Sequence, residues 1–372
     1  MAVTVLLLAA GEGLARVGYE PPPPDEPWMA YSREAGWVRR PGFSGDVHSA
    51  VRTFDAQGLF PNDARGLARR PRRLILAVGD SRTFGVGVDV GATWAEQLER
   101  RLAGTEVVNL GVPGYSARQG RAALELALER PELSRPDIVI FSFGFNDRRY
   151  VLRPEDADGA AAFSRNARRA SWAALLRQSA LLSRLSRPAA TGRVRQGLDL
   201  GSVVPRLPAA EFQRELASVA RLCAERGIGL VFLWTPDNPA QAGDLRAGIQ
   251  AARNGDLDVA REALQRVVKA DNAFSDAARL ELARVYERLG RAGDARAART
   301  SPRLFRSASG GYPILASLSY RAAEQQAARA GHVMVVDASD RLEAEPGVFL
   351  DFCHFDARGH AAVAELLAAR LQ

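Results

Sequence analysis

Lysine is nearly absent from this chain of 372 residues. Lys269 is the single lysine among 50 lysine and arginine residues, and the formal net charge is +7. The densest basic cluster, residues 69–73, is short, so the sequence lacks the extended basic run that favours nucleic-acid binding. We therefore expect no nucleic-acid partner, whereas the positive charge leaves encounters with an anionic polysaccharide or a membrane surface open.

Cysteine is scarce as well. The two cysteines, Cys223 and Cys353, make no disulfide framework, and the absence of a CxxC pair argues against a zinc site of that type. Cys223 lies in a helix predicted over residues 216–225, where we expect a small core residue. Two cysteines neither require nor exclude export of the protein.

The sequence has no long apolar run near its start. Residues 3–10 are apolar, far short of the ~20 residues that span a bilayer, and no basic stretch of the signal-peptide type precedes them. They are either a packed terminal helix or the tail of a membrane anchor or signal. Four prolines at 21–24 form a stiff spacer that can hold a domain off a surface, which favours the anchor. We expect residues 1–25 to give membrane association in the cell envelope, periplasmic or extracytoplasmic; the alternative is a cytoplasmic protein.

Hydrophobic residues, by contrast, are plentiful at 47%, enough for a sizeable core. Five short apolar runs are predicted strands: residues 74–78, 107–110, 138–143, 230–235 and 333–337. Helical patterns are predicted over residues 94–102, 117–129, 209–225, 315–330 and 361–371. This alternation predicts a doubly wound α/β fold, with a parallel sheet covered on both faces.

Two connections are too long for simple crossovers. The first, residues 146–229, places Trp172 and several leucines on one helical face, with arginines elsewhere around it. We interpret it as a helical cap on the sheet domain; an arginine-rich helix on a membrane surface is the alternative.

The second long connection contains a repeat. The pattern that begins at Gly255 returns loosely at Gly290, thirty-five positions later. This spacing resembles the tetratricopeptide helical hairpin, with a period of 34, although small residues at helix–helix contacts would give a similar pattern. We predict a tetratricopeptide-like helical insertion over residues 241–302, leaning on the main domain and offering a docking surface to a protein partner.

Two stretches carry residues suited to nucleophilic acyl transfer. Ser81 follows the first predicted strand, which places it at the carboxyl edge of the sheet, where ligands bind in such folds. His354 is the best candidate base among four histidines. Asp351 precedes it by three residues and can orient its imidazole from the same turn.

Donors for a developing oxyanion are found at neighbouring strand ends. Asn146 ends the third predicted strand and offers its side-chain amide. Gly111 ends the second strand, where a glycine lets a backbone N–H approach closely. The N–H of Ser81 is the third candidate donor.

Each of these residues also has a structural interpretation. Ser81 could be a helix N-cap, and Asn146 with the next residue a turn. His354, His360 and Asp351 could form a metal cluster, although we expect His360 to pack at the start of the last helix. Two neighbours complete the region: Asp80 is expected to support the turn behind Ser81, and Cys353 to point away from the site.

Four blocks in order resemble the SGNH (GDSL-type) hydrolase family. They are Gly79-Asp80-Ser81, Gly111, Gly144-Phe145-Asn146-Asp147 and the Asp351-x-x-His354 motif, and the resemblance covers roughly residues 73–240 and 303–372. It implies a flavodoxin-like three-layer α/β/α sandwich with a five-stranded parallel sheet. It also implies esterase chemistry with Ser81 as nucleophile, His354 as base, and Gly111 and Asn146 in the oxyanion hole.

The chain departs from this family at two positions. Arg82 replaces the leucine of the GDSL motif, and Phe355 stands where many members have proline. We expect Arg82 to narrow or charge the site without removing a catalytic group. The segment over residues 36–59 resembles the region that precedes the first strand in membrane-anchored bacterial members.

These observations predict a hydrolase domain over residues 26–240 and 303–372, with the cap within 146–229. We expect a serine esterase or deacylase acting on short acyl esters of a carbohydrate or envelope substrate, with no cofactor and no metal. An O-acyltransferase would use the same residues with a sugar hydroxyl in place of water. The alternative from another class is a catalytically idle docking protein that acts through the insertion.

Overall fold

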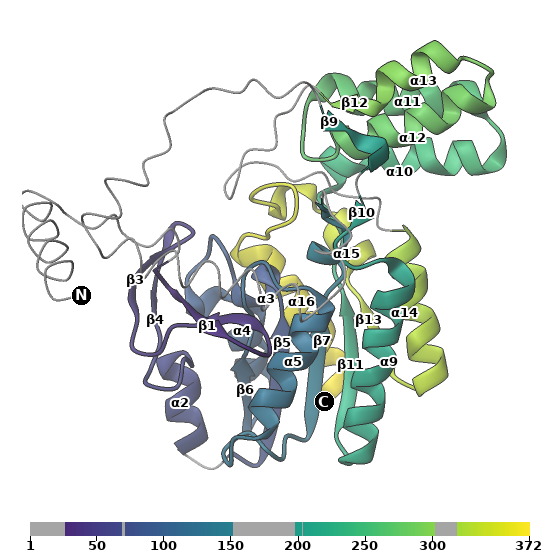
Figure 1. Cartoon of the computed structure of the whole chain (residues 1–372). Helices are drawn as coiled ribbons and strands as arrows, with labels where there is room; N and C mark the ends of the chain where they lie inside the picture. Colours follow the sequence, from purple (N-terminus) through teal and green to yellow (C-terminus); the bar gives the residue numbers. More distant parts are fainter. Residues whose placement is uncertain (1–26, 69–70, 152–197, 203, 302–317) are drawn as a thin grey trace, which may run out of the picture.

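A five-stranded parallel sheet forms the centre of the molecule (Figure 1). The computed structural model describes residues 27–68, 71–151, 198–202, 204–301 and 318–372. The strands are β5 (Arg73–Gly79), β6 (Thr105–Asn109), β7 (Ile138–Ser142), β11 (Gly229–Trp234) and β13 (Met334–Asp337). They lie in the order β13-β11-β7-β5-β6, with all neighbours parallel. All five predicted strands are confirmed, each end within two residues.

Helices cover both faces of the sheet. On one face lie α5 (Ala117–Leu128), α9 (Ala209–Glu225) and α14 (Leu318–Gly331); on the other lie α4 (Trp94–Arg101) and α16 (Ala357–Leu371). Alternate residues of β5 enter the two cores, Leu76 on the first face and Ile75 on the second. The predicted three-layer α/β/α sandwich is therefore confirmed.

The helices begin and end where the sequence supplies caps and apolar faces. Asp356 caps α16 by accepting the N–H groups of Arg358 and Gly359, so this helix begins four residues earlier than predicted. Helix α9 has the predicted bounds and buries Phe212, Leu216, Val219 and Cys223 along one side. Cys223 is the core residue that the sequence predicted.

Two hairpins before the sheet were not predicted. They pair β1 (Met29–Ser32) with β2 (Gly36–Arg39), and β3 (Ser44–Val47) with β4 (Ala50–Thr53), and α2 (Pro61–Ala68) follows. Their four-residue strands include Gly36 and Gly45, which weaken a strand pattern in the sequence. The hairpins belong to the main core, where Trp28 and Phe54 pack with Phe84.

Four further helices form a separate cluster at the carboxyl edge of the sheet (Figure 1). They are α10 (Pro239–Asn254), α11 (Leu257–Ala270), α12 (Ser275–Arg288) and α13 (Ala292–Arg299). Gly255 and Gly290, the glycines of the repeat, are the left-handed residues after α10 and α12, with φ of 95° and 71°. The repeat thus marks two helical hairpins; their tetratricopeptide character and the domain boundaries stay predictions.

The remaining elements are short. They are α3 (Ser81–Phe84), α15 (Ser339–Glu343), the 3-10 turns η1 (Val90–Ala92), η2 (Asn146–Arg148), η3 (Leu200–Ser202) and η4 (Pro346–Val348), and the strand pairs β8 (Tyr150–Val151) with β10 (Val204–Pro205) and β9 (Leu198–Asp199) with β12 (Thr300–Ser301).

Some predictions concern residues outside the described part of the chain. These are the apolar segment and proline spacer within residues 1–25, and the Trp172 face of the predicted cap. Among the helices that the structure describes, none combines the length and apolarity needed to cross a bilayer.

Candidate active site

Ser81 lies at the carboxyl end of β5, next to the point where the chain order of the sheet reverses. It is the first residue of α3, and Asp80 before it is the N-cap, accepting the Arg82 N–H at 2.9 Å. The interpretation of Ser81 as the cap is therefore wrong, and Asp80 supports the turn as predicted. Ser81 is thus placed at the crevice where doubly wound sheets bind ligands.

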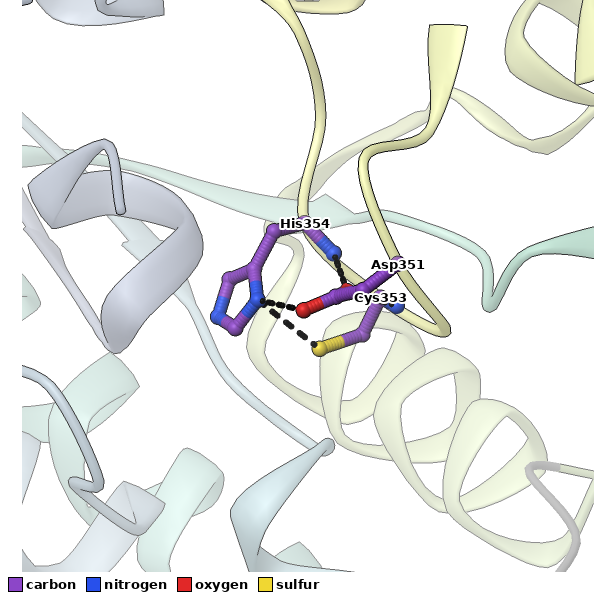
Figure 2. A group of neighbouring side chains, drawn as sticks. All are labelled: Asp351, Cys353 and His354. Carbon is purple, nitrogen blue, oxygen red and sulfur yellow. Dashed lines mark hydrogen bonds and ion pairs between the residues drawn. The ribbon is translucent and has the colours of Figure 1, made fainter. Parts of the chain in front are cut away.

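His354 joins Ser81 to Asp351. Its Nε2 lies 2.8 Å from Ser81 Oγ, a residue 273 positions away, and its Nδ1 lies 2.6 Å from Asp351 Oδ2. Figure 2 shows the Asp351 carboxylate beside one ring nitrogen of His354, with the other nitrogen on the opposite side of the ring. The loop is fixed by Asp351 Oδ1, which accepts the N–H groups of Cys353 and His354 at 2.8 Å each.

The carboxyl group of Asp351 is held ionised. Burial opposes its charge, but the hydrogen bond from His354, the charge of that imidazole and the two backbone N–H groups outweigh it and lower the pKa of Asp351 to about 2. When the imidazole is neutral, an ionised acceptor at Nδ1 keeps the ring proton on that nitrogen. The lone pair of Nε2 then faces the Ser81 hydroxyl, as proton abstraction requires.

Asn146 lies at the carboxyl end of β7, in the turn η2, with its side chain 3% exposed. One amide hydrogen of its Nδ2 is directed to Asp80 Oδ2 at 3.3 Å, and among the described residues the second has no acceptor, so it is available to a ligand. Asp147 holds this turn, since its two carboxylate oxygens accept the N–H groups of Ala117 and Gly144 at 2.8 and 2.9 Å. Burial raises the pKa of Asp147 to about 6. Asn146 and Asp147 thus form the turn that the sequence predicted, and the same turn places the side-chain amide of Asn146 near Asp80.

Gly111 does not present the donor expected of it. Its N–H donates to Asn109 Oδ1 at 3.0 Å, so the hydrogen is already used. A Cβ at this position would lie 2.3 Å from the backbone nitrogen of Phe84, so the glycine is needed for close packing against α3. The oxyanion role predicted for Gly111 is corrected: its function here is packing.

Gly114, which the sequence analysis did not select, offers a backbone donor instead. The N–H of Val112 donates to the Gly79 carbonyl at 3.0 Å. Gly114 lies two residues after Val112, just as Ser81 lies two residues after Gly79. Within the described part of the chain, its N–H makes no hydrogen bond, and its φ is +81°. The Pro113-Gly114 pair is a turn signal that could have drawn attention to it.

Arg82 is buried next to Asp80 and exposes little of its side chain. It is 3% exposed, donates to the Thr235 carbonyl at 3.1 Å, and lies 5.1 Å from the centre of the Phe145 ring. The buried pair of Arg148 and Asp237, with a 2.9 Å contact, lies against the same ring. The buried side chain does not narrow the site as expected, whereas its Nε lies 3.5 Å from Asp80 Oδ1, so the expectation that Arg82 charges the site stays a prediction.

Cys353 differs from the expectation, whereas His360 agrees with it. Cys353 Sγ points to the site, 3.7 Å from His354 Nδ1, which contradicts the prediction that it points away. Its loop is a tight turn closed by Asp351 Oδ1, so the alternation of an extended strand does not apply. His360 packs at the start of α16 as predicted, where its Nδ1 accepts the Trp94 N–H at 3.1 Å and burial lowers its pKa to about 3.

The structure changes which residues could form the metal cluster that the sequence analysis gave as an alternative. His360 is bound to Trp94 and lies outside the cluster proposed from the sequence. Among the residues that the structure describes, Asp351, Cys353 and His354 form a group whose ligand atoms all lie within 4.8 Å of one another (Figure 2).

Three solved structures can be aligned with most of this chain at low sequence identity. A lipolytic protein of the G-D-S-L family from Desulfitobacterium hafniense DCB-2 is 11% identical over 81% of this chain and 100% of its own, with a TM-score of 0.39. A G-D-S-L family member from Veillonella parvula DSM 2008 is 12% identical over 80% and 97%, with a TM-score of 0.38. Axe2, an acetylxylan esterase from Geobacillus stearothermophilus, is 13% identical over 80% and 93%, with a TM-score of 0.38.

A search among curated proteins finds no match to the chain. A family model described as the GDSL-like Lipase/Acylhydrolase family matches residues 77–362, well over half of the chain. That range begins within β5, just before Ser81, and ends within α16, just after His354. The chain therefore belongs to the GDSL-like lipase/acylhydrolase family and is a hydrolase of ester bonds.

Proposed function

We propose that this protein is a serine esterase or deacylase that hydrolyses short acyl esters with Ser81 as its nucleophile. One observation carries the proposal: His354 contacts Ser81 Oγ through Nε2 at 2.8 Å and Asp351 through Nδ1 at 2.6 Å. A hydroxyl, a base and a group that orients the base are what nucleophilic acyl transfer requires.

The reaction proceeds in two stages. Ser81 Oγ attacks the ester carbonyl carbon while His354 Nε2 takes the hydroxyl proton, and the imidazolium then gives that proton to the departing alcohol. The acyl group stays on Ser81 as an ester. Water, activated by the same nitrogen, attacks this acyl-serine and releases the carboxylic acid. General base catalysis of this kind contributes roughly 10²–10⁴ in rate.

Three donors would stabilise the oxyanion of each tetrahedral intermediate. The free hydrogen of Asn146 Nδ2 is one, and the backbone N–H groups of Ser81 and Gly114 are the others; in the described residues neither backbone group has a hydrogen-bond partner. We assign Gly114 the place that the sequence analysis gave to Gly111. Loss of one such donor typically lowers turnover by ~10²–10³.

An acylated carbohydrate is the substrate class that we propose. Trp37, which is partly buried, lies beside Gly114: a Cβ on that glycine would lie 3.3 Å from the indole ring. The contact is with Cζ2 at the edge of the indole, while Tyr115 and Arg206 pack against the ring. An apolar edge this near the oxyanion donors can contact the apolar face of a sugar ring. The cell-envelope location and the membrane association expected from residues 1–25 belong to this proposal, and fractionation of the full-length protein tests them.

Labelling with a fluorophosphonate probe tests the nucleophile, alongside hydrolysis of an aryl acetate. We expect the parent protein to be labelled, Ser81→Ala to lose the label, and its turnover to fall by at least about 10³-fold. Ser218→Ala on α9 removes a serine outside the site and serves as the control. A label that persists in Ser81→Ala refutes the assignment, and an unlabelled parent protein favours the idle docking role.

Product analysis separates hydrolysis from transfer. With an acetylated sugar as donor and a second sugar as acceptor, a hydrolase releases acetate, whereas an O-acyltransferase yields an acetylated acceptor. Acetate release that is unaffected by the acceptor is the outcome that we expect.

A further inference from the structure

We propose that Asp351, Cys353 and His354 also form a binding site for a thiophilic divalent cation such as Zn²⁺ or Cd²⁺, and that a bound cation switches the esterase off. The inhibitory part rests on the function proposed above, whereas the binding part does not. The three residues supply oxygen, sulfur and nitrogen, the donor set that such cations take in proteins.

The donor atoms converge from one short loop. Cys353 Sγ lies 3.7 Å from His354 Nδ1, and Asp351 Oδ2 lies 2.6 Å from the same nitrogen. All three point to a common space on the side of the imidazole that faces away from Ser81 (Figure 2). Asp351 Oδ1 is engaged by two backbone N–H groups, so the loop keeps its shape while Oδ2 is available as a ligand.

The spacing is close to what a tetrahedral cation needs. Zinc bonds of about 2.0–2.3 Å place neighbouring ligand atoms roughly 3.3–3.7 Å apart. The sulfur–nitrogen separation already satisfies this, and Oδ2 must move away from Nδ1 by somewhat less than 1 Å. The sulfur–oxygen pair, which lies within 4.8 Å, must come into the same range. Asp351 can make that movement because its side chain is 40% exposed, and its exposure also gives an ion a way to the buried thiol. Water would supply the fourth ligand.

Binding at Nδ1 would invert the tautomer that the triad needs. The Cys353 thiol releases one proton as its sulfur bonds to the cation, and the proton on Nδ1 passes to Nε2. No electron is transferred, and two anionic ligands balance the charge of the cation. With a hydrogen on Nε2, His354 donates to Ser81 Oγ and can no longer accept its proton, so acylation stops.

Cadmium titration of the full-length protein tests both parts of the proposal. Ultraviolet absorbance from sulfur-to-cadmium charge transfer reports thiolate ligation and does not depend on esterase activity. We expect one equivalent of Cd²⁺ to bind in the parent protein and in Cys223→Ser, the control that removes the other thiol. Cys353→Ser and Cys353→Ala should lose the absorbance, and circular dichroism verifies that each variant is folded.

Hydrolysis is followed in the same titration, with each variant compared to its own metal-free rate. The parent and Cys223→Ser should lose activity as the absorbance rises and regain it with a chelator, while Cys353→Ser should need at least about tenfold more Cd²⁺. Mg²⁺, which prefers oxygen ligands, should not inhibit. Charge-transfer absorbance that is missing in the parent protein, or unchanged in Cys353→Ser, refutes the site. Binding without loss of activity refutes the inhibition, and absent hydrolysis refutes only the proposed function.

Discussion

At the scale of single residues, His354 depends on the ionisation state and hydrogen-bonding capacity of Asp351. Oδ1 of that carboxylate accepts two backbone N–H groups and Oδ2 accepts the imidazole Nδ1–H. An amide in this place could keep the backbone contacts through its oxygen, but its NH₂ would then face Nδ1. The imidazole would have to accept at Nδ1 and carry its hydrogen on Nε2, the tautomer that cannot take a proton from Ser81.

Asp351→Asn should therefore lower turnover of an aryl acetate by about 10⁴-fold near neutral pH while leaving the fold intact. Steady-state kinetics measure the loss, and the melting temperature verifies folding. Asp356→Asn is the matched control, since Asp356 caps α16 five residues further along the chain. Turnover in Asp351→Asn within tenfold of the parent value would contradict the assigned role.

At the scale of elements, the loop that carries Asp351 and His354 is held by the start of the helical cluster. The Asn238 side chain donates to the Asp351 carbonyl at 2.8 Å, and its backbone N–H donates to the Phe352 carbonyl at 3.0 Å. Asn238 also caps α10 by accepting the Ala240 N–H. The ring of Phe352 stacks on Phe145, with centres 5.8 Å apart. The same residue thus begins the cluster and fixes the loop that orients His354.

Asn238→Ala should lower kcat about tenfold with little change in KM, because a freed Asp351 backbone misplaces the base without altering substrate contacts. Loss of the cap should also lower the free energy of unfolding by about 1 kcal/mol. Kinetics and denaturant unfolding measure the two effects.

Asn272→Ala provides the comparison. Asn272 bonds to the Gln241 carbonyl and to the Phe274 N–H, both within the helical cluster. We expect a similar loss of stability with unchanged kcat. Equal losses of kcat in the two variants would mean that the effect comes from stability alone.

The hairpins before the sheet contact another part of the site, the segment that follows β6. Arg39, at the end of β2, donates to the carbonyls of Asn109 and Gly111 at 2.7 and 3.0 Å, and its guanidinium lies 4.4 Å from the Phe60 ring. Burial lowers the pKa of Arg39 to about 10, against the charge of Asp63. These contacts fix the segment that leads to Gly114.

At the scale of the whole molecule, stability should depend on one buried carboxyl group. Glu324 on α14 is 1% exposed, and its Oε2 has no hydrogen-bond partner in the described structure. Burial, with Asp337 nearby, raises the pKa of Glu324 to about 8, in opposition to Arg321 and Arg82. A carboxyl group whose pKa is higher in the folded state binds more protons there, so folding is favoured at low pH.

The free energy of unfolding should therefore fall as pH rises from about 5 to 8, with a slope of up to roughly 1.4 kcal/mol per pH unit for one proton. Between pH 6 and 8 Asp147, with a pKa of about 6, contributes little, whereas burial also raises the pKa of Asp63 well above its usual value. The contribution of Glu324 is therefore the difference in slope between the parent protein and Glu324→Gln. Glu324→Gln should flatten the slope in this interval, and Glu365→Gln, at an exposed position, should not. Parallel slopes in Glu324→Gln and the parent protein would contradict the prediction.

The sequence alone determined the architecture and the candidate site residues. Apolar runs and helical periodicity are local properties, so all five strands and the alternation of the sandwich could be predicted from them. Ser81, Asn146 and Asp351-x-x-His354 stand at strand ends or before the last helix, and the parallel sheet brings such positions to one edge.

Tertiary structure decided how individual atoms are used. Asn109 accepts the Gly111 N–H, whereas that of Gly114 has no partner among the described residues. Arg82 is buried and donates to the Thr235 carbonyl, and a turn closed by Asp351 directs the Cys353 thiol to His354. Each outcome depends on competition among hydrogen-bonding groups, some of them far apart in the chain, and on side-chain directions that residue spacing does not fix. The residue types at the candidate site were therefore predictable, but which backbone N–H is left without a partner and where the Cys353 thiol points were not.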